Sequence, residues 1–129
     1  MPVIADHMSR ELLSVGADER IPAAARSMVE RGVGAVLVLE GGRLEGILTE
    51  RDVLRAVAKG GAEHDLVRDW MTVHPETVEA AESTDHAAAL MIHGGFRHLP
   101  VLEGGNVVGI VSIRDLMRVV LQDSAPRGV

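Results

Sequence analysis

Residues 38–42 read Val-Leu-Glu-Gly-Gly, and residues 101–105 repeat the same five letters. When the chain is shifted against itself by 63 positions, residues 4–57 lie over residues 67–120 without a gap, and 20 of the 54 overlaid pairs are identical. A second block, Gly-Ile-x-x-x-Arg-Asp-x-x-Arg, begins at Gly46 and again at Gly109. This duplication predicts two similar halves that face each other, and any site at their seam should occur in two related versions.

Length and composition limit the class of protein. A chain of 129 residues fits one compact domain or two very small ones. One half alone would be marginally stable, so we expect each half to cover apolar surface of the other. The net charge of −6 at pH 7 and the near absence of aromatic residues disfavour nucleic-acid binding.

Several other classes of function find no support in the sequence. The chain has no cysteine, and its six histidines contain no His-x-x-x-His or His-Glu-x-x-His pattern, so we expect no metal site. No apolar run approaches 18 residues and the first residues do not resemble a signal peptide, so we expect a cytoplasmic protein without membrane contact. No nucleophile and base are arranged as in known catalytic motifs, so we expect no enzyme.

Each half predicts the order strand, helix, strand, strand, helix, which is typical of an α+β unit. The first half predicts an extended segment ending at Val15, a helix over 22–31, strands over 35–39 and 44–48, and a helix over about 50–59. The second half predicts an extended segment ending at Val78, a helix over 87–93 with caps at 83–85, strands over 98–102 and 107–111, and a helix over about 113–122.

Glycines and the remaining segments predict the turns and the boundaries. Glycine pairs at 41–42 and 104–105 indicate hairpin turns, because such turns require positive φ. Residues 59–64 are interpreted as the linker, which divides the chain into a first repeat over 1–61 and a second over 62–129. Residues 124–129 are expected to form a frayed tail.

A repeated motif after the last strand of each half is the main candidate for chemistry. Thr49-x-x-Asp52 and Ser112-x-x-Asp115 stand where strand turns into helix. One interpretation is a helix cap, because a hydroxyl and an acid at this spacing satisfy free amides of the first turn. The other is a nucleotide site, because a helix start attracts phosphate and a carboxylate accepts hydrogen bonds from the vicinal hydroxyls of a ribose.

Taken together, these features resemble a tandem pair of CBS domains, known as a Bateman module. The resemblance rests on the repeat length, the Met-Ser or Met-Thr near the start of each half, the stretch Arg97-His98-Leu99-Pro100-Val101 and the two Thr/Ser-x-x-Asp motifs, and it covers residues 4–121. It implies a β-α-β-β-α fold in each repeat, pseudo-twofold packing of the two repeats, and two clefts between them. It also implies a sensor that binds adenine nucleotides or related adenosyl ligands.

The resemblance also implies which residues meet the ligand. One cleft would use Thr49, Arg51 and Asp52 with Arg97 and His98 of the opposite half, and the other would use Ser112, Arg114 and Asp115 with residues 34–35. The expected ligand-binding residues are Ile47, Thr49, Arg51, Asp52, Arg97, His98, Pro100, Ser112, Arg114 and Asp115. Because Arg97 and His98 overlay Gly34 and Ala35, we expect the first cleft to bind a phosphorylated ligand better.

The functional prediction follows from this resemblance. We expect a regulatory module without catalytic activity that binds AMP, ADP, ATP or S-adenosylmethionine as a regulatory ligand and requires no cofactor. A homodimer through apolar helix faces at 53–57 and 116–121, and an effector protein that reads the signal, are the expected partners. A protein-interaction scaffold with empty clefts remains the alternative.

Overall fold

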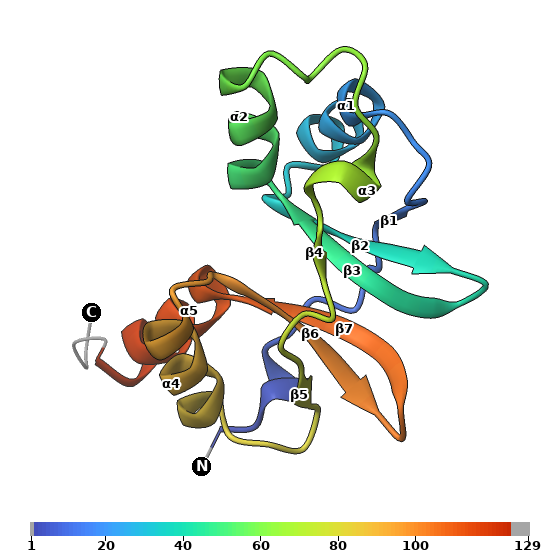
Figure 1. The fold of residues 1–129 in the computed structure, drawn as a ribbon. Helices are drawn as coiled ribbons and strands as arrows, with labels where there is room; N and C mark the ends of the chain where they lie inside the picture. The colour runs from blue at the N-terminus through green and yellow to red at the C-terminus, as the bar shows by residue number, and fades with distance from the viewer. Residues whose placement is uncertain (1, 125–129) are drawn as a thin grey trace. The chain divides into compact units, whose positions relative to one another are not determined.

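The computed structural model describes residues 2–124, which form two compact units. The central unit is Leu12–Pro75, and the terminal unit combines the start of the chain up to Glu11 with the residues from Glu76 onward. Each unit is therefore built from parts of both sequence repeats, and each is described by itself below (Figure 1).

The central unit contains a four-stranded sheet with two main helices. Its elements are β1 (Ser14–Val15), α1 (Ile21–Arg31), β2 (Ala35–Glu40), β3 (Arg43–Thr49), α2 (Glu50–Ala58), α3 (Val67–Trp70) and β4 (Thr72–Val73). The strand order is β1-β2-β3-β4, with β1 parallel to β2 and the other neighbours antiparallel.

The terminal unit repeats this plan. Its elements are η1 (Ile4–Asp6), β5 (Val78–Glu79), α4 (Thr84–Gly94), β6 (His98–Glu103), β7 (Asn106–Ser112) and α5 (Ile113–Ser124). The strand order is β5-β6-β7, with β5 parallel to β6 and β6 antiparallel to β7. Ser9 forms an isolated antiparallel bridge to Ile110 on the free side of β7, in the place that β4 takes beside β3.

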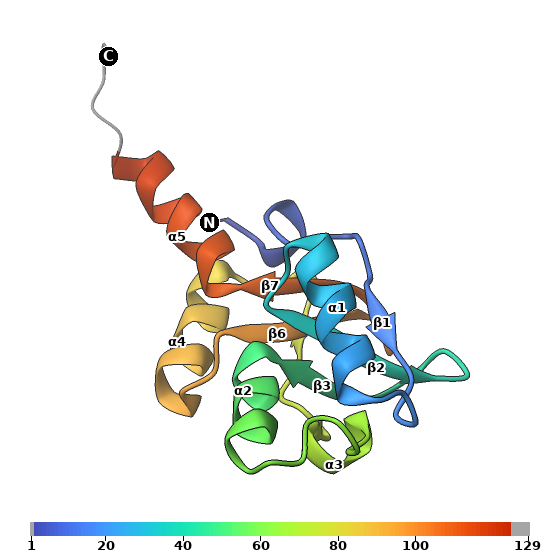
Figure 2. The same cartoon turned by 90° about the horizontal axis from the view of Figure 1, so that it is seen from above.

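The core of the central unit lies between one face of its sheet and its helices, and Figure 2 shows α1 and α2 over the strands β1 to β3. Alternate residues of a strand point to the same face, so Val36 and Val38 both reach this core. Ile21, Ala24 and Met28 of α1 cover them, and Ala56 of α2 completes the layer.

The terminal unit uses equivalent positions for its core. The core residues of this unit are buried between its strands and one face of α4 and α5. They are Val78, Ala87, Met91, Leu99, Val101, Val111 and Leu116, with Ile4 from the start of the chain.

Glycines end the predicted helices and form the predicted hairpins. Gly32 and Gly95 stop α1 and α4 in the left-handed conformation, where a residue without Cβ meets no steric penalty. The turns at 41–42 and 104–105 have φ of 58 to 83°, as the sequence predicts for both glycine pairs.

Two segments, which we call straps, each belong to one sequence repeat but pack in the compact unit that is formed mainly by the opposite repeat. The N-terminal strap, residues 2–9, lies along the terminal unit beside the start of α4: Thr84 donates its amide to the carbonyl of Pro2 at 3.1 Å, and Ile4 donates to the carbonyl of Glu82 at 2.9 Å. Ser9 and Ile110 exchange backbone hydrogen bonds of 2.9 and 3.0 Å. Ile4 is fully buried there.

The middle strap, residues 65–73, holds the central unit in the same manner. Val67 donates to the carbonyl of Glu19 at 2.8 Å and is fully buried, and Trp70 Nε1 donates to Asp65 Oδ2 at 2.7 Å. Thr72 pairs with Ile47 on β3.

The predicted fold class is confirmed: two similar β-α-β-β-α arrangements form a mixed α/β protein with two sheets. The connections between the compact units lie near residues 11 and 75, whereas the interpreted linker, residues 59–64, lies inside the central unit. The compact units do not correspond to the sequence repeats, so the division into repeats 1–61 and 62–129 stays a prediction. Of the tail predicted over 124–129, Ser124 ends α5 and the rest lies outside the described residues.

Candidate functional site

The first motif forms a capping box at the start of α2. Thr49 is the N-cap residue, and its Oγ1 accepts a hydrogen bond from the Asp52 amide at 3.3 Å. Asp52 Oδ2 in turn accepts from the Thr49 amide at 2.9 Å and from the Thr49 hydroxyl at 3.0 Å. The capping interpretation of this motif is thus confirmed.

The second motif has the same geometry at the start of α5. Asp115 Oδ2 accepts from the Ser112 amide at 2.8 Å and from its hydroxyl at 3.0 Å, while Ser112 Oγ accepts from the Asp115 amide at 3.2 Å. Two copies of one arrangement, one in each unit, show that the hydrogen bonds of the motif form between residues close in sequence.

Each carboxylate uses only one oxygen for the cap. Asp52 Oδ1 meets Arg55 Nη1 at 3.9 Å, and Asp115 Oδ1 meets Arg118 Nη1 at 3.7 Å. Both distances are too long for a hydrogen bond, and the arginine side chains are more than half exposed, so these pairs hold the oxygens weakly. Asp52 is buried as a residue, but no buried side-chain oxygen among the described residues lacks a hydrogen-bond partner, so its Oδ1 is open to solvent.

The amides at the helix starts are mostly used already. The Glu50 amide donates to the Gly34 carbonyl at 2.9 Å, and the Ile113 amide donates to the Arg97 carbonyl at 2.8 Å. Since the acid of each motif also donates its amide to the cap, a phosphate at these helix starts would depend on arginine side chains.

Arg51 and Arg114 are available for that task. Both lie in the first turn of their helix, are exposed, and form no side-chain hydrogen bond or ion pair with the part of the chain that the structure describes. A guanidinium in this state can bind two phosphate oxygens without breaking an existing pair.

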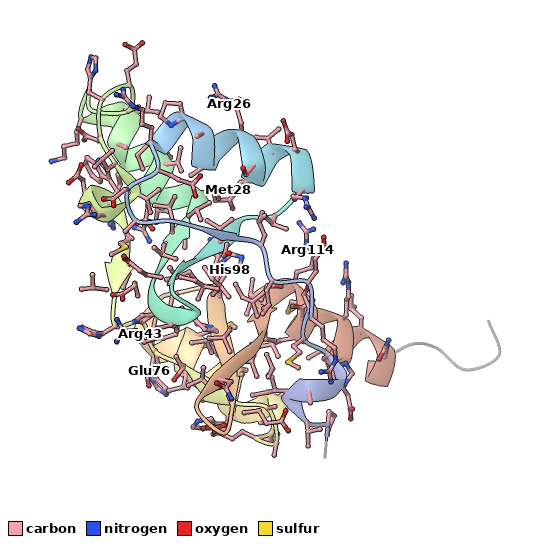
Figure 3. The ribbon with its side chains drawn as sticks, turned by 90° about the vertical axis from the view of Figure 1, so that its right-hand side faces the viewer. Arg26, Met28, Arg43, Glu76, His98 and Arg114 are labelled. Atoms are coloured by element: carbon pink, nitrogen blue, oxygen red, sulfur yellow. The ribbon has the colours of Figure 1, made fainter. Side chains whose placement is uncertain are left out.

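Arg97 and His98 lie beside the second motif within the terminal unit. His98 on β6 is paired in register with Ser112 on β7, and Figure 3 labels His98 together with Arg114, which follows at the start of α5. In the central unit the equivalent pair is Ala35 and Thr49. The two motifs therefore differ: the Ser112 motif has His98 as its strand neighbour and Arg97 directly before that strand, whereas the Thr49 motif has Ala35 and Gly34 at these positions.

The predicted site residues thus fall into two groups. Ile47, Thr49, Arg51 and Asp52 belong to the central unit, and Arg97, His98, Pro100, Ser112, Arg114 and Asp115 belong to the terminal unit. Ile47 and Pro100 occupy strands β3 and β6. The predicted combination of the first group with Arg97 and His98 joins residues of different units and stays a prediction.

The sequence interpretation missed the role of the straps in holding these motifs. Ser9 and Thr72 pair with the isoleucines of the two motif strands, two residues before each N-cap. The repeated Met-Ser and Met-Thr was the available signal. Each of these pairs packs closely against a glycine: an added Cβ at Gly46 would lie 2.5 Å from the Thr72 carbonyl oxygen, and one at Gly109 would lie 2.7 Å from that of Ser9.

Two further observations bear on other kinds of site. Within residues 2–124, no group of three His, Cys, Asp or Glu side chains is placed to hold a metal ion. None of the helices described there has the length and apolar character needed to cross a membrane.

The sequence comparison defines the class of protein. The profile of the CBS domain matches residues 4–59 and again residues 67–122, with the same offset as the internal repeat. The chain belongs to the CBS domain family and carries two of these domains in tandem. It is 34% identical over 117 residues to the CBS domain-containing protein YhcV of Bacillus subtilis, spanning 90% of this chain and 84% of that one.

Solved structures agree with this assignment. A protein with CBS domains from Burkholderia ambifaria MC40-6 is 36% identical, with a TM-score of 0.86 over 94% of this chain and 90% of that chain. The CBS domain pair of protein MJ0100, in complex with 5-methylthioadenosine and S-adenosyl-L-methionine, is 25% identical, with a TM-score of 0.85 over 92% and 98%. CBSX2 in complex with AMP is 25% identical, with a TM-score of 0.81 over 96% and 99%.

Proposed function

We propose that this chain is a regulatory module without catalytic activity, which binds an adenosine-containing ligand and passes a change of shape to a partner protein. The observation that carries the proposal is the duplicated capping box, in which an aspartate keeps one carboxylate oxygen without a hydrogen bond. AMP, ADP, ATP and S-adenosylmethionine all present two vicinal ribose hydroxyls to such an oxygen.

The chemistry of the capping box supports ribose binding. A carboxylate accepts up to four hydrogen bonds, and each cap uses two, both on Oδ2. The cap also fixes the position of the carboxylate, so binding a ribose costs little further loss of side-chain freedom. The same aspartate thus serves as a cap and as a ligand-binding residue, and the two interpretations of the motif do not exclude each other.

The relatives support the ligand class. The structures of CBSX2 and of the MJ0100 domain pair hold AMP, 5-methylthioadenosine and S-adenosylmethionine, which share an adenosyl group. By analogy we assign that class of ligand to this chain, with Ile47, Thr49 and Asp52 in one site and Ser112 and Asp115 in the other.

The cations give the two sites different preferences. Arg51 and Arg114 are placed to meet phosphate at either motif, whereas Arg97 and His98 exist in one copy only. His98 pairs with Ser112, which brings the Arg97 cation to the second motif. If Arg97 and His98 instead act with Thr49 and Asp52, as the resemblance implies, the first motif receives that cation. In either case one site binds a phosphorylated ligand better, and Arg97→Ala removes the difference.

Apolar side chains on the helix surfaces support a homodimer. Leu54 and Val57 on α2 are 68% and 59% exposed, and the equivalent Met117 and Val120 on α5 are 50% and 54% exposed. The repetition at matching positions in both units indicates a common use. Met117 thus differs from the helix methionines Met28 and Met91, which are buried in the cores of their units. We also propose a cytoplasmic location.

Thermal unfolding in the presence of each ligand tests the proposal. A ligand present at 100 times its dissociation constant stabilises the folded state by about 2.7 kcal/mol, so AMP, ADP, ATP, NAD and S-adenosylmethionine can be ranked by their effect on the midpoint. We expect at least one to raise the midpoint in wild type and to lose this effect in the double variant Asp52→Asn, Asp115→Asn. No effect of any ligand on wild type would contradict the proposal.

The scaffold with empty clefts remains the second candidate, because the capping boxes account for both motifs without a ligand. In that case the variants lose stability and the ligands change nothing.

A further inference from the structure

The two units are joined by two very short connections. Ser9 is hydrogen-bonded to Ile110 in the terminal unit, and after only three intervening residues, 10–12, the carbonyl of Leu13 accepts from the Leu37 amide in the central unit at 3.1 Å. The second connection has four residues, 74–77, between Val73, paired with Gly46, and Val78, paired with Val101. Any change in the orientation of the units must therefore be taken up by a few backbone torsions.

One residue in these connections has an unfavourable backbone conformation. His74 has φ of 49°, and among the described residues it is the only one other than glycine with positive φ. Histidine tolerates this left-handed region better than most residues, but the conformation still stores strain. His74 also precedes Pro75, and the proline ring pushes the preceding residue toward extended conformations.

The positive φ of His74 is not shared by the equivalent residue of the first repeat. Glu11 occupies the position equivalent to His74 in the other connection and does not have positive φ. Strained torsions cluster at functional sites, among them segments that switch between conformations. The second connection is thus distinguished from the first by conformation as well as by its proline.

We propose that His74 and Pro75 form a strained hinge, and that a change of the His74 backbone from the left-handed to the extended region reorients the two units. Because the middle strap ends at this hinge and Thr72 pairs with the strand that carries the Thr49 motif, the hinge also connects that motif with the terminal unit. This regulatory part of the proposal rests on the proposed function, whereas the mechanical part does not.

The distance between the units measures the hinge directly. Arg26 on α1 and Ala89 on α4 are equivalent exposed positions of the two units, and Figure 3 shows Arg26 projecting outward from α1. The natural sequence has no cysteine, so Arg26→Cys with Ala89→Cys carries a spin label at two known places. Pulsed electron–electron double resonance on labelled protein diluted with unlabelled protein then gives the distance between the two spin labels of one chain.

Substitutions at His74 decide the mechanical part. His74→Val disfavours the left-handed region because its side chain is branched at Cβ, whereas His74→Gly permits it. We expect His74→Val to shift the main distance by more than the width of the wild-type distribution, and His74→Gly to keep the main distance. His64→Val, in an exposed turn within the central unit, is the matched control and should leave the distribution unchanged. A His74→Val distribution identical to wild type would overturn the hinge.

AMP as the probe decides the regulatory part. We expect saturating AMP to move the wild-type distance and to have a smaller effect on His74→Val. Calorimetric binding of AMP without any change of distance would overturn the regulatory role and leave the proposed function intact. Absence of AMP binding in calorimetry would count against the regulatory role together with the proposed function, while the comparison of His74→Val with His64→Val would still decide the mechanical hinge.

Discussion

At the scale of single residues, Asp52 and Asp115 use one carboxylate oxygen for the helix cap, and the proposed function assigns the other oxygen to the ligand. Oδ2 accepts the amide and the hydroxyl of the N-cap residue, and Oδ1 has only a distant arginine. The cap holds the carboxylate in place, so the second oxygen is oriented before a ligand arrives. If the proposed function holds, stability and ligand binding depend on the same side chain and must be separated by experiment.

Replacing Asp52 by alanine should reduce stability and ligand binding together. Loss of the cap should cost about 1 kcal/mol in the free energy of unfolding, measured with urea. Asp69→Ala is the matched control, because Asp69 caps α3 by accepting from the Leu66 amide at 2.8 Å but belongs to neither motif. We expect the control to lose a similar or smaller stability and to retain ligand affinity. Equal loss of affinity in both variants would indicate that affinity follows stability alone.

A methyl group on Gly109 should disturb the N-terminal strap. The added Cβ would stand 2.6 Å from Met8 Sδ and 2.7 Å from the Ser9 carbonyl oxygen, so the strap must move. We expect Gly109→Ala to lower the free energy of unfolding by about 1–3 kcal/mol, as forced overpacking does. At Gly16 the added Cβ finds its nearest neighbour at 3.7 Å, and Gly16→Ala should have little effect. Unchanged stability of Gly109→Ala would mean that the strap does not press on β7.

At the scale of elements, the straps make each unit depend on residues from the other repeat. Ile4 is buried among α4, β6 and β7, and Val67 is buried among α1, β2 and β3. Removal of either side chain leaves a cavity that the remaining strap cannot fill. Each unit therefore owes part of its core to a strap that belongs by sequence to the other repeat.

Ile4→Ala should destabilise the terminal unit selectively, by about 2–5 kcal/mol. Hydrogen exchange measured by mass spectrometry should then increase in residues 78–111 and remain near wild type in residues 15–56. Val67→Ala is the mirror variant and should increase exchange in residues 15–56 instead. Faster exchange in residues 15–56 of Ile4→Ala would show that the N-terminal strap stabilises the central unit. That result would contradict the packing of this strap in the terminal unit.

The elements were predictable from the sequence where the signal was local. The helix stops at Gly32 and Gly95, the hairpins at the glycine pairs and the start of α2 at Thr49 all depend on residues adjacent in the chain. The destination of the straps was not predictable, because Ile4 could bury itself equally well in either of two similar cores. The backbone pairing of Ser9 with Ile110 fixes the strap to the terminal unit, and the sequence pattern does not specify which strand a short segment pairs with.

At the scale of the whole molecule, the exposed apolar side chains of α2 and α5 predict self-association. Leu54→Glu with Met117→Glu should convert a dimer into a monomer in sedimentation velocity, since a buried unpaired carboxylate is costly at an interface. Ile92→Glu on α4 is the matched control, because Ile92 is 75% exposed but lies on another helix. A wild-type protein that sediments as a monomer would remove this part of the account.

The proposed function requires that this pair of CBS domains binds an adenosyl ligand through Asp52 and Asp115. The most direct measurement is isothermal titration of the wild-type protein with AMP, ADP, ATP and S-adenosylmethionine, repeated on Asp52→Ala, Asp115→Ala and the double variant. The account predicts that at least one ligand binds wild type, that each single variant loses one site, and that the folded double variant binds none. A double variant that binds as wild type does, or a folded wild type that binds none of the four, would contradict it.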